Sequence, residues 1–262
     1  MINSGPRRPD AKRRSSLHVI NLNTFCFILP WILILSSCSK SNNSTTNSAS
    51  LPVTYTEDVR SSVIGNSITT YNLSYDGQGR LLSMISTSSP VFKLTYQYSG
   101  NSFTSDMYNN DVLQIHEMYW LNGASLVDST FQYNNTQDST TEKYLYDASK
   151  ELTQKIEYEY HQTGSIPTTI TNYSYDNSGN LLSESTNTGS TTQYTYTNLP
   201  NVNFFSSYFP QPKYLINTAT VSVSGFLETA THYYSFDNSN RLTKDSIYTA
   251  ATNITVIKSY TY

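Results

Sequence analysis

Four aspartates recur in the chain with similar neighbours, and carboxylates are a common source of acid–base chemistry in proteins. Each follows an aromatic residue and precedes a glycine, asparagine or lysine by three positions; they are Asp76, Asp147, Asp176 and Asp237. An Asp that opens a turn accepts hydrogen bonds from backbone amides two residues on. Gly79 and Gly179 supply the positive φ that the end of such a turn needs. We therefore predict four turn-forming aspartates in separate hairpins and no catalytic set.

The other residues with catalytic potential lack the spacing that metal or nucleophile chemistry requires. His116, His161 and His232 are scattered, whereas a zinc site needs three or four converging ligands. No Gly-x-Ser-x-Gly segment or phosphate-binding glycine loop occurs. Glu157 and Glu159 could form a carboxylate pair for glycoside hydrolysis, but their alternation with tyrosines favours a solvated strand face. The sequence predicts no catalytic residue, no metal and no cofactor.

One aromatic segment is a candidate binding site. Trp120 follows Tyr119, and Tyr108 precedes both by about one strand length. Exposed aromatic faces suit sugars and peptides. We take Trp120 and Tyr119 as the candidate binding residues, with a packed core tryptophan as the alternative.

The composition indicates β-structure. The chain has 23 tyrosines and only 13% charged residues, and Tyr and Thr are favoured on pleated, half-buried surfaces. Large residues alternate, as in Tyr71, Leu73 and Tyr75, which places them on one face of a strand. We predict an all-β fold, a repetitive antiparallel hairpin meander that forms a large curved or rolled sheet and buries its tyrosine face. The pattern leaves open whether the sheet closes into a barrel.

The repeated phrase Tyr-x-Tyr-Asp-x-x-Gly-x-Leu resembles the YD repeat of the Rhs family. It is more similar still to that of uncharacterised YD-like lipoproteins of Bacteroidetes-type bacteria, which also carry a segment like Trp120-Leu-Asn122-Gly123. The resemblance covers roughly residues 53–262. It implies a YD-repeat-like architecture and no particular activity. Large Rhs shells that enclose toxins need many more repeats, so encapsulation is not implied.

The amino terminus is typical of a targeting sequence. A basic stretch, Arg7–Arg14, precedes an apolar run, Phe25–Leu35, which is too short to span a bilayer. Leu35-Ser-Ser-Cys38 resembles the bacterial lipobox, which implies lipidation of Cys38 and cleavage before it. Residues 39–50 are Ser, Thr and Asn with little else, a composition typical of flexible tethers.

We thus expect a lipoprotein signal peptide at 1–37, a lipidated Cys38 with a tether to residue 52, and a β domain at 53–262. Of 16 basic and 19 acidic residues, five basic and one acidic precede Cys38. The remainder carries a net charge of −7, which argues against a nucleic-acid partner. The predicted partners are a membrane, through the lipid, and a glycan or an envelope protein. The outer membrane is the expected location, and its leaflet is left open.

These features favour a non-enzymatic cell-envelope lipoprotein whose β domain is a binding or scaffold module. One alternative is a glycan-binding lipoprotein of a polysaccharide-uptake system. Another is a hydrolase with scattered site residues, for which the irregular stretch 201–215 is the best location.

Overall fold

The computed structural model describes residues 51–134, 139–161, 164–165, 169–201 and 208–262. Cys38, the predicted signal peptide and the predicted tether up to residue 50 lie outside the described residues. Within them, no helix is long and apolar enough to cross a membrane. The described strands, in chain order, are β1 (Thr54–Ser61), β2 (Ser67–Tyr75), β3 (Leu81–Ser86), β4 (Phe92–Ser99), β5 (Ser102–Asn109), β6 (Val112–Leu121), β7 (Val127–Asn134), β8 (Ser139–Tyr146), β9 (Leu152–His161), β10 (Gly164–Ser165), β11 (Thr169–Tyr175), β12 (Leu181–Thr186), β13 (Thr191–Pro200), β14 (Tyr214–Val223), β15 (Phe226–Phe236), β16 (Leu242–Thr249) and β17 (Ile254–Thr261).

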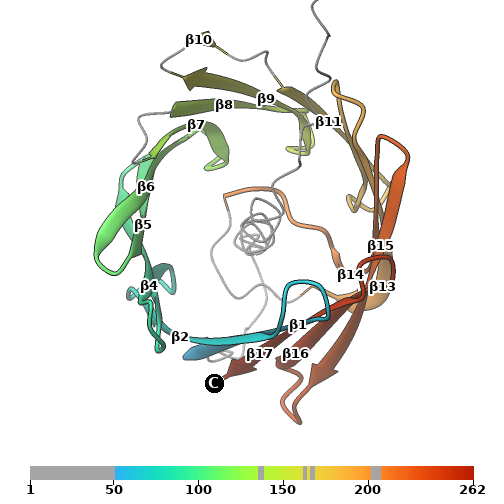
Figure 1. Ribbon diagram of the computed structural model, residues 1–262. Coiled ribbons are helices and arrows are strands. Elements are labelled where there is room, and N and C mark those ends of the chain that lie inside the picture. Colours follow the sequence, from blue (N-terminus) through green and yellow to red (C-terminus); the bar gives the residue numbers. More distant parts are fainter. Residues whose placement is uncertain (1–50, 135–138, 162–163, 166–168, 202–207) are drawn as a thin grey trace, which may run out of the picture. The chain divides into compact units, whose positions relative to one another are not determined.

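The sheet closes on itself. Apart from β10, each strand pairs antiparallel with the next, and β1 pairs with both β2 and β17, as the ring in Figure 1 shows. The short β10 pairs with the end of β9, and β9 also pairs directly with β11. Of the 17 described strands, all but β10 therefore form the circuit, a 16-stranded antiparallel barrel.

The predicted antiparallel hairpin meander is confirmed, but the shape differs from the predicted curved or rolled sheet because the barrel is closed. Closure depends on pairs such as Tyr55 with Tyr260, which lie at opposite ends of the domain sequence. No local pattern carries that information. Closing the circuit pairs the backbone groups that two edge strands would leave open.

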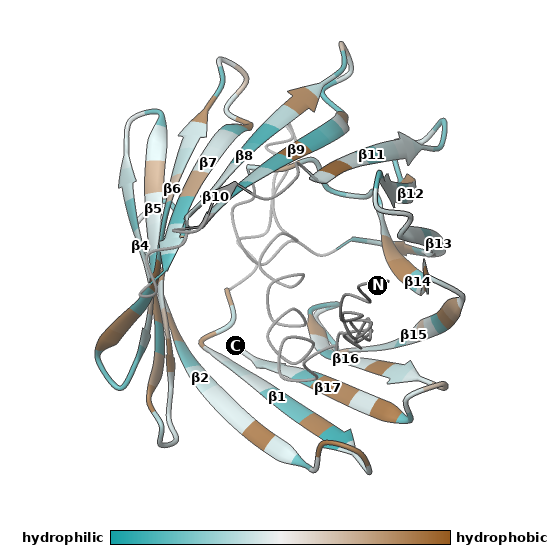
Figure 2. Cartoon of the chain, turned by 45° about the horizontal axis from the view of Figure 1, so that its top comes forward, coloured by the Kyte–Doolittle hydropathy of each residue, from teal (hydrophilic) through white to brown (hydrophobic). Residues whose placement is uncertain are grey.

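The tyrosines of the repeated phrases lie on the inner face. A buried cluster of Phe103, Val127, Tyr144 and Leu152 contacts further rings from the same wall, among them Tyr98. Serine, threonine, asparagine and glutamine occupy most of the intervening, outward positions. Figure 2 shows the resulting alternation of hydrophilic and hydrophobic residues along the strands. The period of two in the sequence thus separates an aromatic inner wall from a hydroxyl-rich outer wall.

The four repeated aspartates shape hairpin turns at one end of the barrel, here called the Asp-turn end. In the β2–β3 turn, Asp76 Oδ1 accepts hydrogen bonds from Gln78 N and Arg80 N, both at 2.9 Å. Arg80 Nε donates to the other oxygen at 2.6 Å. Gly79 has a φ of 76°, a value that glycine adopts without a Cβ penalty. Equivalent turns are formed by Asp147, Asp176 and Asp237.

A fifth turn of this kind has Asn122 in place of Asp. Asn122 Oδ1 accepts hydrogen bonds from Ala124 N at 2.9 Å and Leu126 N at 3.1 Å. Ser125 takes the positive φ, 61°, that Gly79 has in the first copy. In the sequence this segment stands out only for its resemblance to lipoproteins, because Asn122 and Ser125 replace the Asp and Gly that mark the turn elsewhere.

Tyrosine hydroxyls connect each turn to the next hairpin. Tyr98 Oη on β4 donates to the carbonyl of Leu81 at 2.8 Å, on the neighbouring strand β3 just after the Asp76 turn. The same bond recurs after other turns; its members are Tyr146 to Val127, Tyr196 to Leu181 and Tyr262 to Leu242. The second tyrosine of the Tyr-x-Tyr pair at the end of the second strand after each of these turns therefore braces neighbouring hairpins to each other.

The described residues 208–213, which precede β14, lie against the inner wall at the Asp-turn end. They are drawn in orange inside the ring in Figure 1. Tyr208 O accepts a hydrogen bond from Val127 N at 2.9 Å, and its ring stacks on Phe103 with centroids 4.9 Å apart. Phe209 contacts Tyr144 edge-on at 5.0 Å. Because these partners lie on β5, β7 and β8, residues 208–213 cover part of this end of the lumen.

Candidate binding site on the inner wall of the barrel

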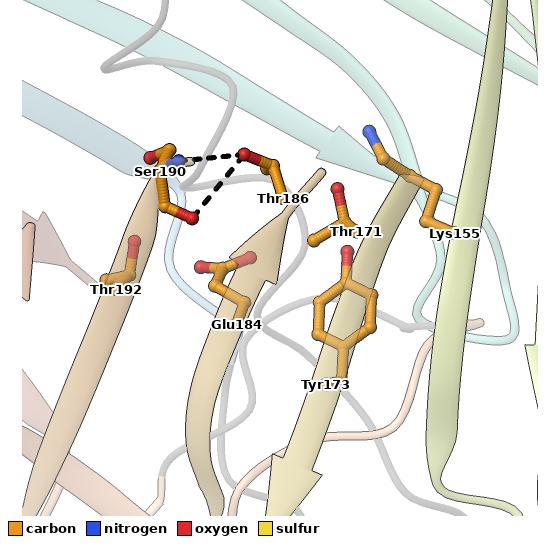
Figure 3. A pocket seen from close by; sticks show the side chains of 7 residues that line it. All are labelled: Lys155, Thr171, Tyr173, Glu184, Thr186, Ser190 and Thr192. Carbon is orange, nitrogen blue, oxygen red and sulfur yellow. Dashed lines mark hydrogen bonds between the residues drawn. The ribbon is translucent and has the colours of Figure 1, made fainter. Parts of the chain in front are cut away.

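A polar recess of about 200 Å³ lies on the inner wall. Its lining residues come from β9, β11, β12, β13 and the residue before β13, and their side chains point the same way (Figure 3). The lining consists of Lys155, Thr171, Tyr173, Glu184, Thr186, Ser190 and Thr192. Hydroxyls therefore dominate the wall, with one carboxylate, one ammonium group and one aromatic ring.

Cross-strand register explains why these residues meet. Lys155 is opposite Thr171, which is opposite Thr186 on the next strand. Glu184 is opposite Tyr173 on one side and Thr192 on the other. Directly opposed residues in antiparallel strands have their Cβ atoms about 5 Å apart on the same face. Two adjacent rows of the inner wall thus make the recess.

Lys155 sits between two glutamates. Its Nζ lies 2.7 Å from Glu142 Oε1 and 3.1 Å from Glu157 Oε2. Burial alone would lower the pKa of Lys155, but the charges and hydrogen bonds of the two glutamates outweigh it and raise that pKa. Burial raises the pKa of Glu142, but the charge and hydrogen bond of Lys155 and the hydrogen bonds of Tyr144 and Glu157 together lower it by more, so the net shift is downward. The pair is therefore charged at neutral pH and fixes the ammonium at the edge of the recess.

A tyrosine of the neighbouring strand β13 fixes the carboxylate of Glu184 by a hydrogen bond. Tyr194 Oη donates a hydrogen bond to Glu184 Oε1. Burial, followed by the charge of Glu184, raises the pKa of Tyr194 well above its ordinary value, so the phenol keeps its proton. At the upper edge in Figure 3, Thr186 Oγ1 accepts a hydrogen bond from Ser190 N at 3.0 Å. The recess therefore has acceptors and donors in fixed positions.

Another carboxyl, that of Glu117, lies on the inner wall of the barrel outside the recess. Glu117 on β6 is 4% exposed, and burial raises its pKa to about 8. Tyr119 Oη donates to Glu117 Oε2. Glu117 is therefore mostly protonated at neutral pH, and its neutral carboxyl forms part of the inner wall.

The two predicted binding residues lie on opposite faces of β6. Tyr119 points inward and stacks on Phe103, with ring centroids 4.2 Å apart. Trp120 points outward and is 42% exposed. Adjacent strand residues face opposite ways, so these two rings do not form one platform. Tyr108, on β5, faces outward with Lys93 Nζ 5.3 Å from its ring centroid.

The remaining chemically active residues do not converge. The four turn aspartates belong to four separate hairpins, and no group of three His, Cys, Asp or Glu side chains among the described residues could hold a metal ion. His116 pairs with Asp106 on the outer face at 2.5 Å, and His232 with Asp245 on the inner face at 3.2 Å. The His161 side chain lies outside the described part.

Sequence reasoning missed the lining residues, including Lys155 and Glu184. It treated Glu157 and Glu159 as a solvated strand face, whereas their register places both on the inner wall. A usable signal was present. Glu142 stands two positions before Tyr144, in phase with the tyrosine that faces inward. A charged residue in phase with the buried rings marks a polar spot in the lumen.

Comparison with known proteins relates the chain to other barrels. No protein-family model matches the chain, and no curated protein matches it. A porin-like protein from Bacteroides uniformis aligns with a TM-score of 0.56 at 14% identity, covering 80% of this chain and 97% of that one. A porin-like protein from Bacteroides vulgatus gives a TM-score of 0.59 at 11% identity, covering 81% and 99%. At these identities the likeness concerns the fold alone, and the chain shares the antiparallel barrel of these porin-like proteins.

Proposed function

We propose that this chain is a non-enzymatic binding lipoprotein of the cell envelope, whose barrel holds a small, neutral, polyhydroxylated solute against its inner wall. The observation that carries the proposal is the recess lined by Thr171, Glu184, Thr192 and their neighbours. Liquid water would fill its volume with about six or seven molecules. A sugar-like solute can exchange its hydroxyl hydrogen bonds with such a wall, while the ring of Tyr173 offers an apolar face.

The composition of the outer wall favours a barrel that is surrounded by water and lies beside a membrane. Barrels in lipid carry a continuous apolar band outside, whereas hydroxyl and amide side chains occupy most of the described outward positions of this barrel. Hydroxyl groups pair across neighbouring strands on the outside, as in Ser174 with Ser183 at 2.7 Å and Thr195 with Thr218 at 2.7 Å. Further outward positions of β11 to β14 are Asn172, Ser185, Gln193 and Thr220.

The lipid anchor on Cys38 remains part of the proposal, because such a barrel needs another means of staying at a membrane. The chain enters the barrel at the Asp-turn end, where Val53 N donates to Thr261 O at 2.7 Å. Thr186 and Ser190 of the recess lie beside the β12–β13 turn, at the other end of β12 from the Asp176 turn. In this arrangement the covered end faces the membrane and the recess opens away from it.

Mass spectrometry of the mature amino terminus tests the anchor. We expect the chain purified from cell envelopes to begin at Cys38, with a diacylglyceryl group on the thiol and an acyl group on the amine. A mature chain that begins elsewhere, or that carries an unmodified Cys38, contradicts this part of the proposal.

Equilibrium dialysis of the full chain against labelled glucose and N-acetylglucosamine tests the recess. Thr192→Val removes an inward hydroxyl from the lining, and Thr191→Val is the matched control on the outer face of the same strand. We expect the T192V variant to bind at least one of these sugars roughly 3- to 10-fold more weakly, the worth of one hydrogen bond. The T191V variant should bind as the parent does. Absence of binding, or equal losses in both variants, contradicts the proposal.

A further inference from the structure

The outer faces of β7 and β9 carry exposed aromatic rings that the interior does not use. In the register of the sheet, Tyr133 is opposite Ser139, which is opposite Tyr160. One row along, Phe131 is opposite Thr141, which is opposite Tyr158. Two aromatic ridges, Phe131/Tyr133 on β7 and Tyr158/Tyr160 on β9, thus flank a strand with small hydroxyl residues.

These residues face outward because their neighbours face inward. Glu142 and Glu157, which contact Lys155 in the lumen, alternate with Thr141 and Tyr158 along their strands. The exposed fractions of three of the side chains agree with an outward orientation: 41% for Tyr133, 39% for Tyr158 and 49% for Tyr160. Each of these three rings keeps exposed area that a ligand can bury.

The dimensions suit an extended ligand. The ridges are two strands apart, about 9.5 Å, and the two rings of each ridge are about 6.7 Å apart along the strand. This separation is wider than one sugar ring. A ligand that touches both ridges must therefore contain at least two linked units, and the hydroxyls of Ser139 and Thr141 lie between the contacts.

The charges beside the ridges are already paired. Lys143 Nζ is 2.6 Å from Asp128 Oδ2, in the row next to Thr141. His116 Nδ1 is 2.5 Å from Asp106 Oδ1, in the row of Tyr133. The charged and titratable side chains beside the ridges thus contact one another, and the surface between the rings carries the neutral hydroxyls of Ser139 and Thr141. This suits a chain with apolar CH faces and neutral hydroxyl groups.

We propose that the aromatic ridges of β7 and β9 bind a neutral polysaccharide chain, with sugar rings stacked on the aromatic rings and sugar hydroxyls on Ser139 and Thr141. This site lies on the opposite wall face from the recess and goes beyond the proposed function. A chain held outside and a small solute held inside are separate binding events that different residues control.

Affinity electrophoresis of the full chain in native gels containing dextran, laminarin or xylan tests the ridges. We expect at least one of these neutral polysaccharides to retard the parent. The double variant Tyr133→Ala/Tyr160→Ala should weaken binding by roughly tenfold for each ring lost. Tyr248→Ala is the matched control, because Tyr248 is an outward tyrosine of β16 with the same exposure as Tyr158, 39%. It should leave the retardation unchanged.

A second variant separates stacking from folding defects. Tyr133→Phe/Tyr160→Phe keeps both rings, so it should retain the retardation that the alanine variant loses. The proposal is overturned if no neutral polysaccharide retards the parent, or if the control loses as much binding as the ridge variant. Retardation only by the anionic polygalacturonate, or binding of an envelope protein through the ridges without polysaccharide binding, overturns it as well. The T192V variant should show parental retardation, so failure of the ridges and failure of the recess are distinguishable.

Discussion

At the scale of single residues, the groups that contact a buried acid of the lumen decide whether it carries charge. Glu142 has Lys155 at 2.7 Å and keeps its charge, whereas burial raises the pKa of Glu117 to about 8 despite the hydrogen bond from Tyr119. An acid whose folded pKa is raised binds its proton more tightly in the folded state. Folding stability from Glu117 is therefore intact near pH 4.5, and it is lost as the pH rises toward 8.

Glu117→Gln tests this assignment. We expect the parent to lose unfolding free energy between about pH 5 and pH 8, because ionising Glu117 costs about 1.4 kcal/mol for each unit of pKa shift. The variant cannot ionise there and should lose less, so it should exceed the parent by a few kcal/mol at pH 8. Urea unfolding at several pH values measures the difference between the two proteins. Parallel pH profiles would show that Glu117 titrates normally.

At the scale of elements, the hairpins could be predicted and their partners could not. Asp76 and Gly79 indicate a turn because both the hydrogen bonds and the φ value are local properties. Lys150, with a φ of 69°, occupies the glycine position although its Cβ disfavours it. The turn at Asn122 escaped prediction because Asn and Ser125 replace the two residues that define the phrase. The Asn122 turn therefore keeps the hydrogen bonds and the positive φ of the other copies without their Asp and Gly.

The recess could not be predicted from the sequence for a different reason. Its two rows combine residues from four strands, and the sequence fixes only which face each residue takes on its own strand. Lys155 could be assigned to a face from the positions of nearby tyrosines, but its place opposite Thr171 depends on the register between β9 and β11. Register across a long connection is set by the whole sheet and not by either strand.

At the scale of the whole domain, the alternation of inward and outward residues along each strand decides which side chains line the lumen and which face out. Inward tyrosines, braced by bonds such as Tyr98 to Leu81, line the lumen. Outward hydroxyls face water, and the ridge tyrosines share that outer face. The sequence predicted the alternation and the burial of the tyrosine face, but it left closure open, because closure requires β1 to meet β17.

Nitration of the native full chain with tetranitromethane, read by peptide mass spectrometry, tests this assignment of faces most directly. The reagent attacks exposed phenolates, and burial raises the pKa of the inward tyrosines, which protects them further. We expect early modification of the outward set, Tyr133, Tyr158, Tyr160, Tyr233 and Tyr248. The inward set, Tyr55, Tyr96, Tyr119 and Tyr144, should react only after unfolding. Equal reactivity of the two sets, or faster reaction of the inward set, would contradict the closed barrel with an aromatic lumen.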